Sequence, residues 1–185
     1  MSVVDASQLR SRLRDAFVWR GDPTDEDRYA DVTGWWRDAE LLRLLGPALA
    51  DLFPEAAPTV VLGPDSRGSL IGPLVATHLR IGFVEVRKNR TPASDSDQWI
   101  RRSTPPDYRD RHLELGFRRG LIQSPDHVLV IDDWIDTGSQ ARTIRAMVDG
   151  VGATWVGLGC IVDALHDSRL RRDLRVRSLL HVRDL

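Results

Sequence analysis

Apolar residues along the chain fall into two kinds of pattern that alternate. Four short continuous runs are typical of strands buried on both faces: residues 59–63, 82–86, 127–131 and 155–162. Between them, residues 68–79 and 139–148 repeat their apolar positions with a helical period. Strand, helix and strand in this order predict βαβ units, and therefore an α/β fold with a central, mostly parallel sheet flanked by helices.

Three further segments complete this outline. Asp38 is placed to cap a helix that runs to Phe53, in which Pro47 predicts a kink or a break. Another strand is expected near residues 112–117. From 87 to 107 the apolar pattern gives way to Asn, Ser, Thr, Pro and charged residues, and a loop of that length is usually functional or mobile. We expect a flexible active-site loop there.

The composition limits the kinds of protein that this chain can be. Its 185 residues favour a single domain over residues 1–185, and its net charge of −1 gives no basic field for nucleic acid. The only cysteine, Cys160, lies in an apolar run and is expected to be a buried free thiol. No stretch reaches the roughly 20 apolar residues that span a membrane, and arginines interrupt residues 1–20 where a signal sequence would need an apolar core. We expect a cytoplasmic protein without a nucleic-acid or membrane partner.

The strongest chemical signal follows the predicted strand at residues 127–131. Asp132 and Asp133 come directly after it, and Asp-Thr-Gly-Ser-Gln at residues 136–140 opens the next helix. Since ligands of open α/β sheets bind at the carboxyl ends of the strands, the two acids can accept hydrogen bonds from vicinal hydroxyls. The N–H groups and the dipole of a helix start suit a phosphate. The alternative is that the acids only end the strand and that Asp136 or Thr137 caps the helix. We favour a sugar-phosphate site.

Two segments carry a resemblance to a known family. The segment VLVIDDWIDTGSQ, residues 128–140, resembles the signature of the type I phosphoribosyltransferases, which is an apolar strand, two acids and a short phosphate loop. The segment GPDSRGSLIGPLVATHLRIGFVEVRKN, residues 63–89, is similar to the adenine branch of that family, where an Asp-Ser-Arg-Gly loop precedes a helix, a strand and an Arg-Lys pair. Shorter similarities extend the match over residues 29–180. The resemblance implies the type I phosphoribosyltransferase fold, with a small N-terminal hood at residues 1–35 and a flexible loop at 87–107.

The resemblance also implies which residues bind the substrate. The pyrophosphate would be held by a loop of four residues, Asp65, Ser66, Arg67 and Gly68. Arg87 and Lys88 would add positive charge there, although a solvated basic pair is the alternative. The ribose hydroxyls would be held by Asp132 and Asp133. The 5′-phosphate would be bound by Asp136, Thr137, Gly138, Ser139 and Gln140.

The acid-base residue implied by the resemblance is Glu114, within the segment His-Leu-Glu-Leu-Gly at residues 112–116. Asp136 stands where hypoxanthine-type members of the family carry an acid that serves the purine ring. The acid-base step can therefore belong to Glu114, to Asp136 or to both.

The implied activity is transfer of the 5-phosphoribosyl group from 5-phosphoribosyl pyrophosphate to a nitrogenous base, adenine or another purine, with release of pyrophosphate. The transition state would have oxocarbenium character, as in glycoside cleavage. Because Mg²⁺ keeps waters and binds substrate phosphates, it would be held mainly through the pyrophosphate and ribose, and we expect few direct protein ligands and no dedicated metal cage. The resemblance further implies a homodimer.

Departures from the adenine pattern keep other functions open. Residues 19–27 differ from the Gly-rich, aromatic segment of the adenine branch, so the enzyme could instead act on a non-standard heterocycle in specialised metabolism. A non-catalytic regulator that senses 5-phosphoribosyl pyrophosphate is the third candidate. Trp19 is a candidate for stacking on the base, with packing as an equal alternative, whereas Trp35 and Trp36 are expected to pack. The arginine-rich run at residues 169–177 has interspersed acids and helical spacing, which favour a solvated face over an RNA contact.

Overall fold

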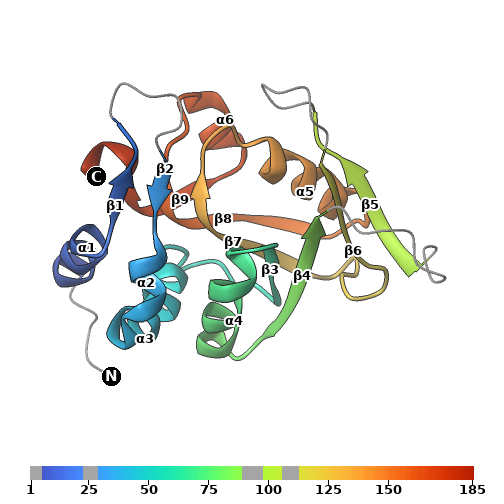
Figure 1. The fold of residues 1–185 in the computed structure, drawn as a ribbon. Coiled ribbons are helices and arrows are strands. Elements are labelled where there is room, and N and C mark those ends of the chain that lie inside the picture. The colour runs from blue at the N-terminus through green and yellow to red at the C-terminus, as the bar shows by residue number, and fades with distance from the viewer. Residues whose placement is uncertain (1–5, 23–28, 89–97, 106–112) are drawn as a thin grey trace.

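The computed structural model describes residues 6–22, 29–88, 98–105 and 113–185, and this part of the chain is built around one large sheet (Figure 1). Its strands are, in chain order, β3 (Val60–Pro64), β4 (Gly82–Lys88), β5 (Trp99–Ser103), β6 (Glu114–Arg118), β7 (His127–Ile135), β8 (Thr154–Asp163) and β9 (Val176–His181). In space they lie in the order β5-β6-β4-β3-β7-β8-β9.

The middle of the sheet and one of its edges are parallel. β4, β3, β7, β8 and β9 run in the same direction, and β6 and β5 join the β4 side in antiparallel pairing. Because β3 and β7 are parallel neighbours, the two sequence motifs that follow them meet at the same edge of the sheet. The predicted α/β fold with a mostly parallel sheet is confirmed.

Helices cover both faces of the sheet (Figure 1). α3 (Ala39–Ala50) and α4 (Gly68–Leu79) pack on one face, in a core that includes Leu45, Ile71 and Leu129. α5 (Ser139–Gly150) and α6 (Ser168–Asp173) cover the other face, where Val130 and Ile144 belong to a second core. Alternate residues of β7 therefore enter alternate cores, as the pleat of a strand requires.

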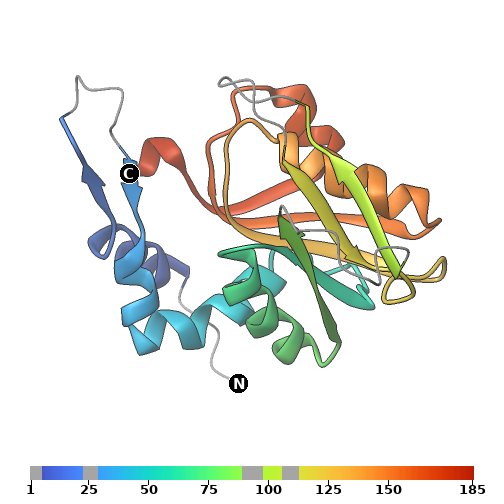
Figure 2. The ribbon, with the colours of Figure 1, turned by 45° about the vertical axis from the view of Figure 1, so that its right-hand side comes forward.

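The N-terminal segment packs at the end of the first core (Figure 2). It consists of α1 (Ala6–Asp15), the antiparallel pair β1 (Val18–Arg20) and β2 (Tyr29–Asp31), and α2 (Thr33–Arg37). The C-terminal turn η2 (Val182–Asp184) lies beside it in both views. This segment coincides with the predicted hood, and its role as a cover for the base stays a prediction.

Several predicted elements have the expected ends. α3 begins at Ala39 because Asp38 Oδ1 accepts hydrogen bonds from the N–H groups of Glu40 at 2.8 Å and Leu41 at 3.2 Å. The helix continues through Pro47 without a break and ends at Ala50, three residues before the predicted end. α4 spans the predicted residues 68–79.

The predicted loop over residues 87–107 is wrong where the structure describes it. β4 extends to Lys88, and β5 occupies Trp99–Ser103 as an edge strand paired with β6. An edge strand forms ladder hydrogen bonds on one side only and needs little apolar sequence, so the run Trp-Ile-Arg-Arg-Ser gave no strand signal. Residues 89–97 and 106–107, the remainder of that prediction, lie outside the described residues, as does His112 of the predicted strand 112–117.

Two other element boundaries differ from the predicted ones. β7 does not end at Ile131 but runs through both acids to Ile135, because β8 continues to pair with it up to Asp163. The arginine-rich run is helical only to Asp173, after which β9 begins at Val176. Cys160 is a buried free thiol, as predicted, and burial raises its pKa well above the ordinary value. None of the described helices has the length and hydropathy to cross a membrane.

Candidate active site

The end of β7 presents two carboxylates to opposite faces of the sheet. Asp133 is only 6% exposed, whereas Asp132 is half-buried and lines a cavity. Burial raises the pKa of Asp132 well above its usual range, and the negative charge of Asp133 acts in the same direction. The backbone N–H of Asp133 donates to Asp132 Oδ1 at 2.9 Å, and the charge of Lys88 also favours the ionised form. A ligand that donates hydrogen bonds would stabilise the charged carboxylate further.

The loop between β7 and α5 is shaped by Gly138. Its φ of 71° is in the left-handed region, and an added Cβ would lie 2.8 Å from Cδ2 of Leu170. The loop leads into the first turn of α5, where the N–H groups at the start of a helix have no partner within the helix. Ser139 Oγ and Gln140 Oε1 are buried and have no hydrogen-bond partner among the described residues. Buried polar atoms without a partner are costly, and a bound polar group would satisfy them.

A cavity of about 280 Å³ joins these groups. Its lining includes Asp132 and residues 136–141, which form the loop and the start of α5. The base of the β5–β6 hairpin also contributes: the Thr104 N–H donates to the Leu113 carbonyl at 2.8 Å, and the Leu113 N–H donates to Thr104 Oγ1 at 3.1 Å. Thr104 and its neighbour Pro105 were not predicted, because they fall in the segment taken for a loop.

The loop after β3 reaches the same edge of the sheet. The peptide bond between Asp65 and Ser66 is cis, and α4 begins at Gly68. An added Cβ on Gly68 would lie 2.8 Å from the Ile131 carbonyl oxygen, so only glycine lets α4 start this close to β7. Arg67 Nη1 donates to Asp133 Oδ2 at 3.0 Å and thereby links the two predicted motifs.

Arg87 and Lys88 lie on opposite faces of β4, as consecutive strand residues must. Arg87 Nε donates to Glu85 Oε2 at 2.5 Å, and its guanidinium lies 5.8 Å from the centre of the Trp99 ring. Ser69 Oγ on α4 donates to the other Glu85 oxygen at 3.2 Å. Lys88 is on the Asp132 side, where its charge acts on that carboxylate. The predicted basic pair therefore serves two faces of the sheet.

Glu114 and Asp136, the two acid-base candidates, occupy different places. Asp136 is exposed and lines the cavity. Glu114 is opposite Ser103 in the β5–β6 pairing and shares its face of the sheet with Arg87. Arg101 Nη1 lies 3.5 Å from Glu114 Oε1, and the Glu114 side chain is 42% exposed. Glu114 is not among the residues that line this cavity.

An aromatic cluster connects the N-terminal segment to β7. Trp19 packs edge-on against Phe17, with ring centres 5.2 Å apart, and against Trp134, at 6.1 Å. Trp134 also lines the cavity, between the acids and the phosphate loop. Trp35 is fully buried and donates from Nε1 to the Leu13 carbonyl at 2.8 Å, which confirms the packing role expected for it. Trp134 was missed, although its position within the motif could have suggested it.

The donor set at this edge of the sheet fits Mg²⁺ held through a substrate. Asp132 and Asp133 supply carboxylate oxygens, the ligands that Mg²⁺ prefers. Among the described residues, no group of three or more His, Cys, Asp or Glu side chains could hold a metal ion alone. Phosphate oxygens and waters would have to complete the coordination.

The fold and the site define a phosphoribosyltransferase: an acid pair lies near the end of β7 and an Asp-Thr-Gly-Ser-Gln loop follows it, while an Asp-Ser-Arg-Gly loop follows the parallel neighbour β3. Residues 39–182 match the family model described as phosphoribosyl transferase domain. The chain belongs to this family, and the predictions of the family, the fold and a phosphoribosyltransferase enzyme are confirmed.

Within the family, the chain is similar to adenine phosphoribosyltransferases. The relative from Cupriavidus taiwanensis is 30% identical over 156 residues, which is 84% of this chain and 77% of the relative. The crystal structure of the Rhodothermus marinus enzyme has 30% identity and a TM-score of 0.79, covering 95% of this chain and 99% of that one. The Trypanosoma brucei enzyme, solved in complex with AMP, pyrophosphate and ribose-5-phosphate, has 25% identity and a TM-score of 0.79, covering 100% and 84%.

Proposed function

We propose that this protein transfers the 5-phosphoribosyl group from 5-phosphoribosyl pyrophosphate to adenine and releases pyrophosphate. The observation that carries the proposal is the pair of buried atoms without a partner, Ser139 Oγ and Gln140 Oε1, in a cavity that also contains the Asp132 carboxylate. A sugar phosphate carries both an anion and vicinal hydroxyls, so a single ligand can bind both kinds of group.

The 5′-phosphate binds at the loop of residues 136–140. There the N–H groups of the first turn of α5 and the positive end of its dipole stabilise the anion. Ser139 Oγ donates to a phosphate oxygen, and the Gln140 amide can turn either its oxygen or its nitrogen toward the ligand. Both side chains then have a partner, with the Gln140 amide turned so that its nitrogen donates to the phosphate.

The ribose hydroxyls donate to the carboxylates of Asp132 and Asp133. The transition state develops positive charge on the ribose ring, as in glycoside cleavage. Ionised carboxylates beside that ring stabilise the developing charge, and hydrogen bonds from the ribose hydroxyls offset the burial that raises the pKa of Asp132. Binding and charge stabilisation are therefore coupled at Asp132.

The leaving pyrophosphate gains negative charge as the bond breaks. Arg67, released from Asp133, offers a planar fork to its oxygens, and Arg87 is held on the same side of the sheet as Glu114. Asp132 and Asp133 would help to hold a substrate-bound Mg²⁺, which would supply further neutralisation of this charge. The backbone N–H of Ser66 belongs to the same loop, whereas that of Asp65 already donates to the Val86 carbonyl at 2.8 Å.

Glu114 is proposed as the acid-base residue that handles the proton of the attacking ring nitrogen. It lies away from the phosphate cavity and on the side of Arg87, whereas Asp136 lies in the cavity beside the proposed 5′-phosphate. An acid next to a phosphate repels it and is less suited to serve the base. Asp136 is the alternative, and a pair of variants separates the two.

Adenine is proposed as the base because the similar proteins named above are adenine phosphoribosyltransferases and because Trp19 and Trp134 offer aromatic rings close to the cavity. The proposal includes a homodimer in the cytoplasm, as the family resemblance implies. Sedimentation of the purified protein would measure the oligomeric state.

The test is pyrophosphate release from 5-phosphoribosyl pyrophosphate and Mg²⁺, with adenine, hypoxanthine, guanine, xanthine, uracil and orotate offered one at a time. Stoichiometric release with adenine alone is expected. If no base gives release while the donor still binds, the proposal fails, and a specialised heterocycle or a sensor of the donor becomes the better account. Fast release with hypoxanthine but not adenine would assign the enzyme to another purine.

A further inference from the structure

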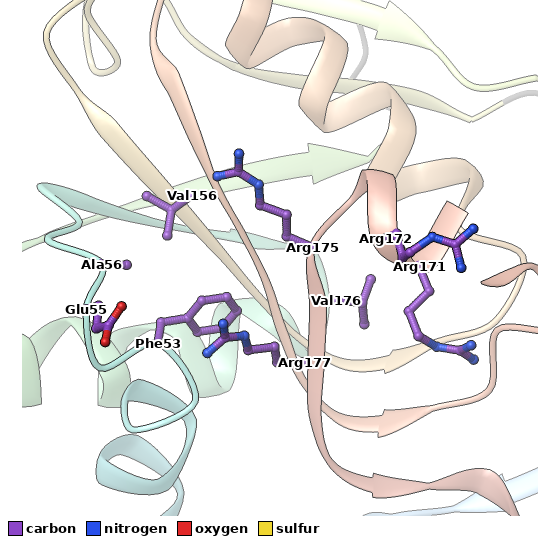
Figure 3. A pocket seen from close by; sticks show the side chains of 9 residues that line it. All are labelled: Phe53, Glu55, Ala56, Val156, Arg171, Arg172, Arg175, Val176 and Arg177. Atoms are coloured by element: carbon purple, nitrogen blue, oxygen red, sulfur yellow. The ribbon is translucent and has the colours of Figure 1, made fainter. Parts of the chain in front are cut away.

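A second hollow, of about 560 Å³ (Figure 3), shares no lining residue with the cavity at residues 136–140. It is formed where α3 gives way to β3 and where β8 and β9 begin, and its lining includes Phe53, Glu55, Val156, Arg175 and Arg177. Val156 precedes Asp163, the β8 residue that pairs with Ile135 at the phosphate loop, by seven positions. At about 3.3 Å per residue, Val156 lies roughly 20 Å from Asp163 along the sheet, while Arg171, at another side of the hollow, contacts Asp163 itself.

Positive charge is concentrated at this hollow. Four arginines line it and Glu55 is the one acid in the lining, although the whole chain has a net charge of only −1. Arg171 is already neutralised, because its Nε lies 2.5 Å from Asp163 Oδ2. The side chains of Arg172 and Arg175 have no hydrogen-bond or ion-pair partner within the described part of the chain. The remaining charge is therefore available to a ligand.

The arginines do not all face the same way. Figure 3 shows Arg175 and Arg177 directed to the side of the hollow where Val156 and Phe53 lie, and Arg172 directed to the other side. Arg177 is fixed in place, since it donates to the Leu52 carbonyl and its guanidinium lies 5.2 Å from the centre of the Phe53 ring. One fixed and one free guanidinium thus border an apolar floor.

We propose that this hollow binds a nucleoside monophosphate, with the phosphate on Arg175 and Arg177, the base over the apolar side chains of Ala56 and Val156, and Glu55 accepting a hydrogen bond from a hydroxyl or amino group. Guanidinium groups are suited to phosphate because their planar fork matches its oxygens. A volume of about 560 Å³ is within the range of roughly 300–1,000 Å³ that small-ligand pockets occupy. The site goes beyond the transferase reaction, because it shares no lining residue with the cavity at the phosphate loop.

A nucleotide fits these features better than a nucleic acid does. A nucleic acid requires a basic stripe along the surface, but Arg171 is ion-paired and Asp167 and Asp173 are interspersed in the run. A free inorganic phosphate would use the two arginines and leave the apolar floor and Glu55 without a partner. A nucleoside monophosphate uses all three kinds of group.

Isothermal titration with AMP tests the proposal in the intact protein. The variant Arg175→Asn removes the free guanidinium, and asparagine tolerates the left-handed backbone at this position, where φ is 50°. We expect wild type to bind AMP at this hollow and Arg175→Asn to weaken that binding event about tenfold or more, as expected for loss of a charge-assisted hydrogen bond. Arg169→Gln, which removes a charge from the same run but not from the lining, should leave it unchanged.

The outcomes can be told apart from those of the transferase reaction. Pyrophosphate release is measured separately in all three proteins and should be equal, so a failure of the proposed function would not alter the binding event that depends on Arg175. The proposal is overturned if Arg175→Asn changes the affinity of no AMP binding event. It is also overturned if a single-stranded RNA binds this face and both variants weaken it equally while AMP does not bind there. A crystal structure with AMP in the hollow would support it directly.

Discussion

Arg67 and Asp133 are 66 residues apart in the chain, yet Arg67 Nη1 lies 3.0 Å from Asp133 Oδ2. The ion pair fastens the loop after β3 to the end of β7. Asp133 is buried, while the side chain of Arg67 is 41% exposed, so solvent screens the arginine but not the acid. In the proposed reaction Arg67 binds pyrophosphate and Asp133 binds ribose. The substrate therefore replaces a contact that the protein already makes.

Arg67→Gln is expected to raise the KM for 5-phosphoribosyl pyrophosphate about tenfold or more. A hydrogen bond to a charged group contributes roughly 1.5–3 kcal/mol, and the neutral amide also leaves Asp133 without its cation. Initial rates at varied donor concentration measure the change. Arg43→Gln is the matched control, because its pair with Glu40, at 2.6 Å, is exposed on α3. An unchanged KM in the Arg67 variant would remove Arg67 from the binding site.

The acid-base assignment predicts unequal effects of two isosteric variants. Glu114→Gln should lower kcat by about 10²- to 10⁴-fold, the usual contribution of a general acid or base, with little change in the KM for the donor. Asp136→Asn should lower kcat by less than about tenfold, because Glu114, the proposed proton-transfer group, is still present. The amide also no longer repels the 5′-phosphate. Single-turnover rates with adenine measure both. The reverse order of losses would transfer the acid-base role to Asp136.

The sequence predicted the parts of the fold that have strong periodic patterns. β3, α4, β4 and β7 are continuous apolar or amphipathic segments, and the order of these elements brings the two motifs to one edge of the sheet. β5 was missed because an edge strand with two arginines has no apolar signature. β1 and β2 were missed because each has only three residues, too few to show an alternating pattern.

Side-chain direction was the part of the site that sequence motifs did not supply. Arg87 and Lys88 were predicted to act together, but the alternation of a strand sends them to opposite faces. The same alternation separates Asp132 from Asp133. Trp134 lines the cavity because β7 continues past the two acids. That continuation depends on pairing with β8, a contact between segments distant in sequence.

The left-handed backbone of Gly138 predicts a steric and a functional cost for a larger residue. In Gly138→Ala the methyl group would meet Leu170 Cδ2 at 2.8 Å, in addition to the strain of a φ of 71°, which costs about 1 kcal/mol or more. Gly120→Ala is the matched control, because Gly120 has a φ of 85° and open space around it. Both variants should lose stability in denaturant unfolding, and Gly138→Ala should lose more.

The same pair of glycine variants also separates stability from binding. Gly138 belongs to the phosphate loop, so Gly138→Ala should raise the KM for the donor about tenfold or more if the loop shifts, as expected when charge-assisted contacts to a phosphate are lost. Gly120 lies in the turn directly after β6, so Gly120→Ala should leave the KM unchanged. Equal KM values in the two variants would contradict the role of the loop.

The raised pKa of Asp132 predicts how stability depends on pH. The raised pKa means that the Asp132 carboxyl binds a proton more tightly in the folded protein than in the unfolded chain. Its favourable contribution to folding is complete below the usual pKa of 3.8 and is lost as the pH rises toward the raised pKa of the folded state. At neutral pH the free protein therefore carries the cost of a buried charge next to Asp133.

Asp132→Asn should remove this cost. Its Tm should exceed that of wild type at neutral pH, and the difference between the two proteins should shrink as the pH is lowered toward 4. Binding of the donor should weaken in the variant, because an amide does not offer the ribose hydroxyls a charged acceptor. Thermal unfolding between pH 4 and 8 measures the first effect, and titration with ribose-5-phosphate the second. A variant less stable than wild type at neutral pH would mean that Asp132 is ionised at little cost in the free protein.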